Sequence, residues 1–305
     1  AIFRYVEAVA PSPQPVLVTG ETGTGKELIA RALHRLSGRT GEFVAVNVAG
    51  LDDTVFADTL FGHARGAFTG ADRARDGLIT GAADGTLFLD EIGDLSAPSQ
   101  VKLLRLLQEG TYYPLGVDRP RQCRARIVVA TNYDVAERVK AGSFRKDLYY
   151  RLRTHHLHLT PLRERLEDIP PLVNHLVEKA AEALRKPPPT PPLELYRLLK
   201  TYGFPGNVRE LEAMIFDAVA LHQGGTLSLH SFKAAMGAGP LLAEDGGRPA
   251  DLAGLLAVER LPTLDEAEEA LVQEALRRAD GNQGVAAGML GLSRQALNKR
   301  LMRRK

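Results

Sequence analysis

The chain has 305 residues, of which 44% are hydrophobic and 25% charged, and its formal net charge is +2. This length suits one large domain or two to three smaller ones, and the weak net charge excludes a uniformly basic nucleic-acid binder. A single cysteine, Cys123, excludes an internal disulfide framework and fits an apolar packing residue in the reducing cytoplasm. No apolar run approaches the length of a membrane span. Because the chain starts at Ala1 inside a helical pattern, we expect it to be a fragment of a longer protein.

The first half of the sequence alternates short apolar runs with helical spacing. Buried strands are predicted at residues 16–19, 43–48, 87–90 and 127–131, and helices at 27–36 and 99–108. Strands and helices that alternate in this way form a parallel sheet covered on both faces. The predicted fold class is therefore α/β.

Strand patterns end near residue 169, and helices follow. Helices at 170–184, 192–202 and 208–222 predict a small all-α lid, and the Gly-, Ala- and Pro-rich segment 237–262 predicts a linker. Further helices are predicted at 263–279, 282–290 and 293–303, the last two forming a helix-turn-helix. The predicted domains are a nucleotide-binding core at 1–168, the lid at 169–236, the linker at 237–262 and a DNA-binding domain at 263–305.

A glycine-rich loop joins the first predicted strand to the first long helix. Its pattern, Gly-x-x-x-x-Gly-Lys, lets backbone amides curl around phosphate oxygens, and Lys26 neutralises the outer phosphates of a nucleotide such as ATP. The predicted nucleotide-binding residues are Gly20, Glu21, Thr22, Gly23, Thr24, Gly25, Lys26 and Glu27. Glu27 is a departure, because most such loops carry Ser or Thr there as a magnesium ligand.

Two adjacent carboxylates, Asp90 and Glu91, end the predicted strand at 87–90. There Asp90 would coordinate Mg²⁺ directly or through water, and Glu91 would orient and polarise an attacking water molecule. The alternative, a plain surface acid pair, is disfavoured by the apolar residues that precede it. Asn47 lies near the end of another predicted strand, and taken alone it is typical of a turn.

Between these two motifs lies an apolar hexapeptide with glycines at its first and fifth positions. Its residues are Gly66, Ala67, Phe68, Thr69, Gly70 and Ala71. The glycines permit a tight, hairpin-like excursion, so we expect Phe68 and Thr69 to be exposed at its tip. Because an exposed aromatic is costly unless a partner covers it, the pattern predicts a loop that nucleotide turnover moves and presents to a partner. The alternative is a buried turn with Phe68 in the core.

The C-terminal 25 residues contain six basic side chains and no acidic one. This is a local positive patch on a nearly neutral chain, as expected for contact with double-stranded DNA. Ser293 is the predicted N-cap of a recognition helix. The predicted DNA-binding residues are Ser293, Arg294, Gln295, Asn298, Lys299 and Arg300. The alternative is a basic, solvated helix end.

Together these motifs resemble the AAA+ domain of bacterial enhancer-binding proteins, the NtrC-like activators of sigma-54 RNA polymerase, followed by a Fis-type helix-turn-helix. The resemblance covers nearly the whole chain, and the hexapeptide is its most specific part. It implies that Asn47 restrains the catalytic Glu91 before partner contact, and that Glu27 is a family trait. Further implied roles are sensor I for Thr131 and Asn132, arginine fingers for Arg145 and Arg151, and sensor II for Arg209.

The resemblance also implies cofactors and partners. ATP and Mg²⁺ would occupy the nucleotide site, the hexapeptide would contact the sigma-54 RNA polymerase holoenzyme, and the C-terminal domain would bind enhancer DNA. Arginine fingers that act on a neighbouring subunit imply a homo-oligomer, a hexamer when active and a dimer when inactive, with no membrane partner.

The sequence leaves two other functions open. One is a DNA-binding regulator whose nucleotide site controls only its oligomeric state; the intact hexapeptide and Glu91 argue against it. Another is a different AAA+ remodeller, such as a helicase or its loader, which leaves the hexapeptide unexplained. His155, His156 and His158 form a weak candidate metal cluster, and we interpret them as ordinary strand residues because no third ligand has suitable spacing.

Overall fold

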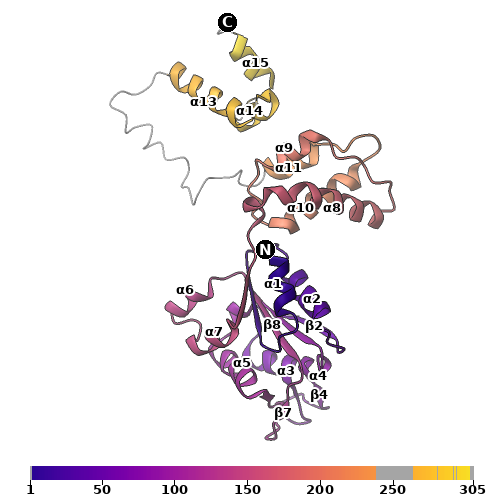
Figure 1. Ribbon diagram of the computed structural model, residues 1–305, viewed down its shortest axis with the longest axis vertical. Helices are drawn as coiled ribbons and strands as arrows, with labels where there is room; N and C mark the ends of the chain where they lie inside the picture. Colours follow the sequence, from indigo (N-terminus) through magenta and orange to yellow (C-terminus); the bar gives the residue numbers. More distant parts are fainter. Residues whose placement is uncertain (1, 238–263, 280, 291, 293, 303–305) are drawn as a thin grey trace. The chain divides into compact units, whose positions relative to one another are not determined.

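The computed structural model describes residues 2–237, 264–279, 281–290, 292 and 294–302 (Figure 1). Contacts among these residues divide them into two units: those of 2–191 and 204–237, and those of 192–203 and from 264 onward. Nearly all of the predicted linker lies outside the described residues. No helix in the described part of the chain is long and apolar enough to cross a membrane.

A five-stranded parallel sheet forms the centre of the first unit, in the order β2-β5-β8-β1-β9. Its strands are β1 (Val16–Thr19), β2 (Phe43–Asn47), β5 (Thr86–Asp90), β8 (Arg126–Thr131) and β9 (His155–His158). The predicted α/β class is confirmed. Because all strands run in the same direction, their carboxyl ends meet at one edge, where Thr19 lies beside Thr131 and Asn47 beside Asp90.

Helices cover both faces of this sheet. They are α1 (Ile2–Val9), α2 (Lys26–Leu36), α3 (Asp53–Phe61), α4 (Leu78–Gly81), α5 (Ala97–Glu109), α6 (Val135–Lys140) and α7 (Lys146–Leu152), with the 3-10 helix η1 (Ile92–Asp94) after β5. Successive strand residues point to opposite faces. Val16 and Val18 therefore pack in one core with α1 and α2, whereas Leu17 packs in another with α3, α4, α5 and α7.

Two short hairpins project from the core between its strands. The first pairs β3 (Gly62–His63) with β4 (Arg75–Asp76), which matches the predicted hairpin-like excursion, and the second pairs β6 (Thr111–Tyr112) with β7 (Arg121–Gln122). Leu115 N donates to Gly62 O and Ala64 N donates to Leu115 O, both at 2.9 Å. The second hairpin therefore lies against the base of the first.

A helical segment follows the sheet within the first unit. It comprises η2 (Leu162–Glu164), η3 (Leu166–Asp168), α8 (Ile169–Ala183), α10 (Asn207–Leu221) and α11 (His230–Gly237). Helix α10 packs against both α8 and α11. Apolar side chains such as Ile215 on α10 and Phe232 on α11 are buried. The bounds of α8 and α10 lie within two residues of the prediction.

The second unit contains α9 (Leu193–Leu199) and three C-terminal helices, α13 (Leu264–Arg278), α14 (Gln283–Met289) and α15 (Arg294–Met302). Asn282 caps α14, its side chain accepting from Gly284 N at 3.0 Å. The three C-terminal helices share a small core built on Val272, Ala286 and Leu297. This is the predicted arrangement of helix, turn and helix.

Candidate nucleotide site, hexapeptide loop and DNA-binding helix

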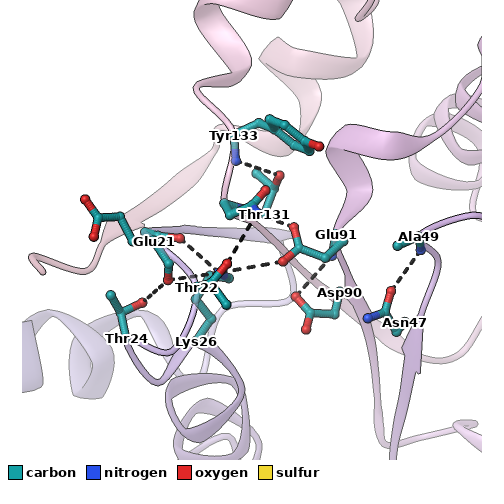
Figure 2. A network of polar contacts seen from close by, with 12 residues as sticks. Glu21, Thr22, Thr24, Lys26, Asn47, Ala49, Asp90, Glu91, Thr131 and Tyr133 are labelled. Atoms are coloured by element: carbon teal, nitrogen blue, oxygen red, sulfur yellow. Dashed lines mark hydrogen bonds and ion pairs between the residues drawn. The ribbon is translucent and has the colours of Figure 1, made fainter. Parts of the chain in front are cut away.

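The glycine-rich loop turns back on itself between β1 and α2 (Figure 2). Gly23 and Gly25 have φ angles of 78° and 101°, the left-handed region that favours glycine. Lys26 is buried at the start of α2, and its Nζ donates to Gly20 O at 2.9 Å. Burial lowers the pKa of Lys26, while the Glu91 and Asp90 carboxylates act in the opposite direction. Lys26 therefore lies between the loop carbonyls and the acids on the neighbouring element, and the effect of burial on its pKa exceeds theirs.

Those two acids lie at the carboxyl end of β5. Glu91 N donates to Asp90 Oδ1 at 3.0 Å, and Glu91 Oε1 lies 3.9 Å from Lys26 Nζ (Figure 2). Glu91 has left-handed backbone angles, φ 60° and ψ 44°, a conformation that costs a non-glycine residue about 1–3 kcal/mol. Such strain is found where a side chain must point in a particular direction, here toward the glycine-rich loop.

The end of β8 connects the loop and Glu91. Asn132 N donates to Glu91 Oε2 at 3.1 Å, and Asn132 Nδ2 donates to Thr22 Oγ1 at 3.4 Å. Thr131 is buried, and its hydroxyl accepts from Tyr133 N at 3.2 Å. Of the two predicted sensor residues, Asn132 therefore connects the glycine-rich loop to Glu91, and Thr131 precedes it at the end of β8.

Asn47 lies at the end of β2, beside Asp90 in the sheet register. Its Oδ1 accepts from Ala49 N at 2.8 Å, so in this structure it makes the turn that its position at a strand end alone predicts (Figure 2). Asn47 and Glu91 line the same cavity. The restraint of Glu91 by Asn47 stays a prediction.

The lid segment meets the loop through backbone contacts. Val208 N donates to Gly23 O at 3.0 Å, and a Cβ on Gly23 would lie 2.1 Å from Gly206 O. Only glycine at position 23 therefore permits this approach. The contact brings the first turn of α10, which carries Arg209, to the nucleotide cavity.

A polar network that the sequence motifs do not reveal fixes the same junction. Asn207 is fully buried; its Oδ1 accepts from Leu162 N, and its Nδ2 donates to Glu21 Oε2 and Thr22 O. Arg163 donates to both oxygens of Glu21, at 2.8 and 2.6 Å, and this lowers the pKa of Glu21. Glu21 thus joins the loop to the lid, a role that the loop pattern alone does not predict.

One cavity of about 370 Å³ collects most of the predicted nucleotide-site residues. Its lining includes Thr22, Gly23, Gly25, Lys26, Glu27, Asn47, Asp90, Glu91 and Arg209. Four basic and four acidic side chains in the described lining suit an anionic triphosphate with a divalent cation. Glu27 is exposed and accepts from Arg31 at 3.0 and 2.7 Å.

The donor set suits magnesium held partly by the nucleotide. Asp90 supplies a carboxylate oxygen of the kind that Mg²⁺ prefers. The described residues contain no group of three or more His, Cys, Asp or Glu side chains that could hold a metal alone, the histidines of β9 included. Thr19 Oγ1 hydrogen-bonds to His156 and His158 instead, at 2.8 and 3.1 Å.

The two predicted arginine fingers are absent from the described lining of this cavity. Arg145 is exposed before α7 and donates to both oxygens of Asp147, at 3.0 and 2.7 Å. Arg151 donates to Leu107 O at 3.0 and 2.9 Å. Neither arginine acts on the nucleotide cavity of its own chain in this structure.

The hexapeptide lies at the end of the first hairpin. Gly66 N donates to Ala71 O at 2.8 Å, and Gly66 and Gly70 have φ angles of 79° and 96°. Ala71 is buried, whereas Phe68 is 39% exposed and Thr69 is exposed too. The expected exposure of Phe68 and Thr69 is confirmed, and the alternative with Phe68 in the core is excluded.

Helix α15 carries most of the predicted DNA-binding residues. Lys299 is exposed and Asn298 is half-buried. Arg294, Gln295 and Arg300 belong to the helix, but their side chains lie outside the described part of the chain, as does Ser293. Their contacts with DNA stay a prediction.

The fold and the cavity define the class: an AAA+ P-loop protein with a helical lid. Residues 1–158 match the Sigma-54 interaction domain, residues 163–244 the AAA+ ATPase lid domain, and residues 263–303 the Fis family of bacterial regulatory proteins. The chain belongs to the bacterial sigma-54-dependent transcriptional activators.

Several curated proteins are similar along the whole chain. The transcriptional regulatory protein ZraR of Klebsiella oxytoca is 41% identical, over 99% of this chain and 66% of its own length. HyfR of Escherichia coli, a DNA-binding transcriptional activator, is 42% identical over 99% of this chain and 46% of its own length. The sigma-54-dependent activator SfnR of Pseudomonas putida is 40% identical, over 99% of this chain and 85% of its own length. The chain thus spans just under two thirds of the ZraR sequence.

Solved structures of NtrX from Brucella abortus have the same fold. The ADP complex has a TM-score of 0.74 and 28% identity, covering 99% of this chain and 67% of that one. The ATP complex has a TM-score of 0.68 and 27% identity, covering 99% of this chain and 66% of that one.

Proposed function

We propose that this chain hydrolyses ATP to convert a closed sigma-54 RNA polymerase–promoter complex into the open one while bound to upstream enhancer DNA. The exposed hexapeptide carries this proposal. In the sequence it lies between the two halves of the nucleotide site, and α3 joins its hairpin to β2, which ends at Asn47 in the cavity, so a change at the nucleotide would reach the loop through α3. The family membership and the ADP and ATP complexes of NtrX support the choice of nucleotide.

Within the cavity, the residues divide the chemical work. Bound ATP with Mg²⁺ would supply the cleavable phosphate bond and charge neutralisation. The backbone amides at Gly23 and Gly25 would cradle phosphate oxygens, and Lys26 and Arg209 would balance their charge. Asp90 would hold the cation, and Glu91 would orient and polarise the attacking water molecule. Thr131 and Asn132 would respond to the terminal phosphate, since Asn132 already touches both Thr22 and Glu91.

The arginine fingers require a second subunit. Because Arg145 and Arg151 lie away from the cavity of their own chain, we propose that they complete the site of a neighbour in a ring, a hexamer when active and a dimer when inactive. Hydrolysis in such a ring would move the hexapeptide toward sigma-54. The C-terminal helices would tether the ring to DNA in the cytoplasm, with α15 as the recognition helix.

Open-complex formation tests this function. Purified protein, sigma-54 polymerase and a promoter with its enhancer are incubated with ATP or with a non-hydrolysable analogue, and melted promoter DNA is measured. We expect promoter melting with ATP and none with the non-hydrolysable analogue. Melting with the analogue would favour the second candidate, a DNA-binding regulator in which nucleotide controls only assembly.

A further inference from the structure

His63 lies at the base of the hexapeptide loop, and both of its ring nitrogens have partners. Nε2 lies 2.9 Å from the main-chain oxygen of Arg73, which can only accept, so Nε2 carries a proton. Nδ1 lies 2.5 Å from Asp58 Oδ1, and Arg75 donates to the other Asp58 oxygen at 3.0 Å. The imidazole therefore bridges the Asp58 carboxylate and the Arg73 main-chain oxygen.

These contacts join three segments around the loop. Asp58 belongs to α3, His63 to the outgoing strand β3, and Arg73 to the returning arm of the loop. The side chains of His63 and Asp58 are only 10% and 16% exposed. Charge-assisted hydrogen bonds shielded from water in this way are stronger than those at the surface. His63 thus holds the two arms of the loop together and to the helix that precedes it.

The same imidazole supports the aromatic side chain at the loop tip. The rings of His63 and Phe68 are 5.0 Å apart between centroids with an interplanar angle of 64°, an edge-to-face contact. Phe68 is otherwise partly exposed. One histidine therefore sets both the closure of the loop base and the position of the exposed aromatic.

We propose that His63 and Asp58 form a positioning unit that holds Phe68 where it meets its partner. This inference rests on the proposed function of the hexapeptide. The charged groups around His63 are Asp58 on α3, Arg75 and Asp76 on β4, and Arg121 on β7, which pairs with Asp76 at 3.1 Å.

The test measures open complexes formed per ATP hydrolysed by the whole chain. His63→Gln and Asp58→Asn should each lower this ratio about fivefold, since each removes one charge-assisted hydrogen bond, while ATP hydrolysis stays within about twofold. In the double variant this ratio should fall no further than in the more strongly affected single variant, because both substitutions remove the same contact. His175→Gln, an exposed histidine on α8, is the matched control.

The ratio of open complexes to ATP hydrolysed separates positioning from general damage to the fold, because general damage would lower both quantities together. An unchanged ratio in His63→Gln overturns the inference. If the wild-type chain itself forms no open complexes, the proposed function fails instead.

Discussion

In the nucleotide site, Glu21, Lys26 and Asn132 each contact a second element of the fold, whereas the polar side-chain contacts around the hexapeptide loop lie at its base. Lys26 contacts the loop carbonyls and lies near Glu91, and Asn132 connects Glu91 to Thr22. Phe68, by contrast, touches the ring of His63 and is 39% exposed. The difference shows what each region needs: chemistry requires groups fixed within tenths of an ångström, and capture of a partner requires an exposed group on a movable support.

The largest effect should come from removing the finger that acts between subunits. Arg145→Ala should lower ATP hydrolysis on the order of 10³-fold with nucleotide binding retained, because its guanidinium would stabilise transition-state charge in the neighbouring site. Mixing this variant with Glu91→Gln should restore part of the hydrolysis, since some interfaces then contain an intact Arg145 and an intact Glu91. Failure of the mixture to recover would contradict an action in trans.

Glu91→Gln alone should lower hydrolysis at least ~10²-fold while ATP still binds, because the amide cannot polarise the attacking water. Steady-state phosphate release and fluorescent-nucleotide titration measure the two quantities. Glu137→Gln is a suitable control, since Glu137 is exposed and paired with Lys140. Loss of nucleotide affinity equal to the loss of rate would show that Glu91 acts in binding rather than in the chemical step.

The free energy of unfolding should also distinguish the core of the sheet domain from the hexapeptide loop. Phe56 on α3 is 1% exposed, so Phe56→Ala should lower the free energy of unfolding by about 3–5 kcal/mol. Phe68→Ala should cost less than about 1 kcal/mol, because the side chain is already partly in solvent. Urea unfolding of both variants makes the comparison. Equal losses would place Phe68 among the structural core residues.

The smallest expected effect is on the pH dependence of stability, through His34. Burial lowers the pKa of His34, which hydrogen-bonds to Thr86 at 3.0 Å, so the fold resists its protonation. As pH falls through the ordinary histidine value, the unfolded chain takes up a proton that the folded chain resists, and stability is lost. The drop in melting temperature between pH 7.5 and 5.5 should therefore be smaller in His34→Gln than in wild type, by at most about 2 °C. An equal drop in both would show that His34 titrates alike in the two states.

The sequence predicts those parts of the site that are contiguous along the chain. The glycine-rich loop and the Asp90–Glu91 pair each carry a short pattern with a physical reason, and so does the hexapeptide. The junction between loop and lid has no such pattern, because Arg163 and Asn207 reach Glu21 from 142 and 186 residues away. The β6–β7 hairpin was also missed, since strands of two residues show no periodicity.

The most direct test of the coupling between nucleotide and loop is Thr69→Ala, assayed for ATP hydrolysis and open-complex yield in the same reaction. Thr69 is exposed in the hexapeptide and absent from the described lining of the nucleotide cavity. We predict that open-complex formation falls at least tenfold, equivalent to about 1.4 kcal/mol, while hydrolysis stays within about threefold of wild type. A normal open-complex yield from this variant would contradict the role of the loop.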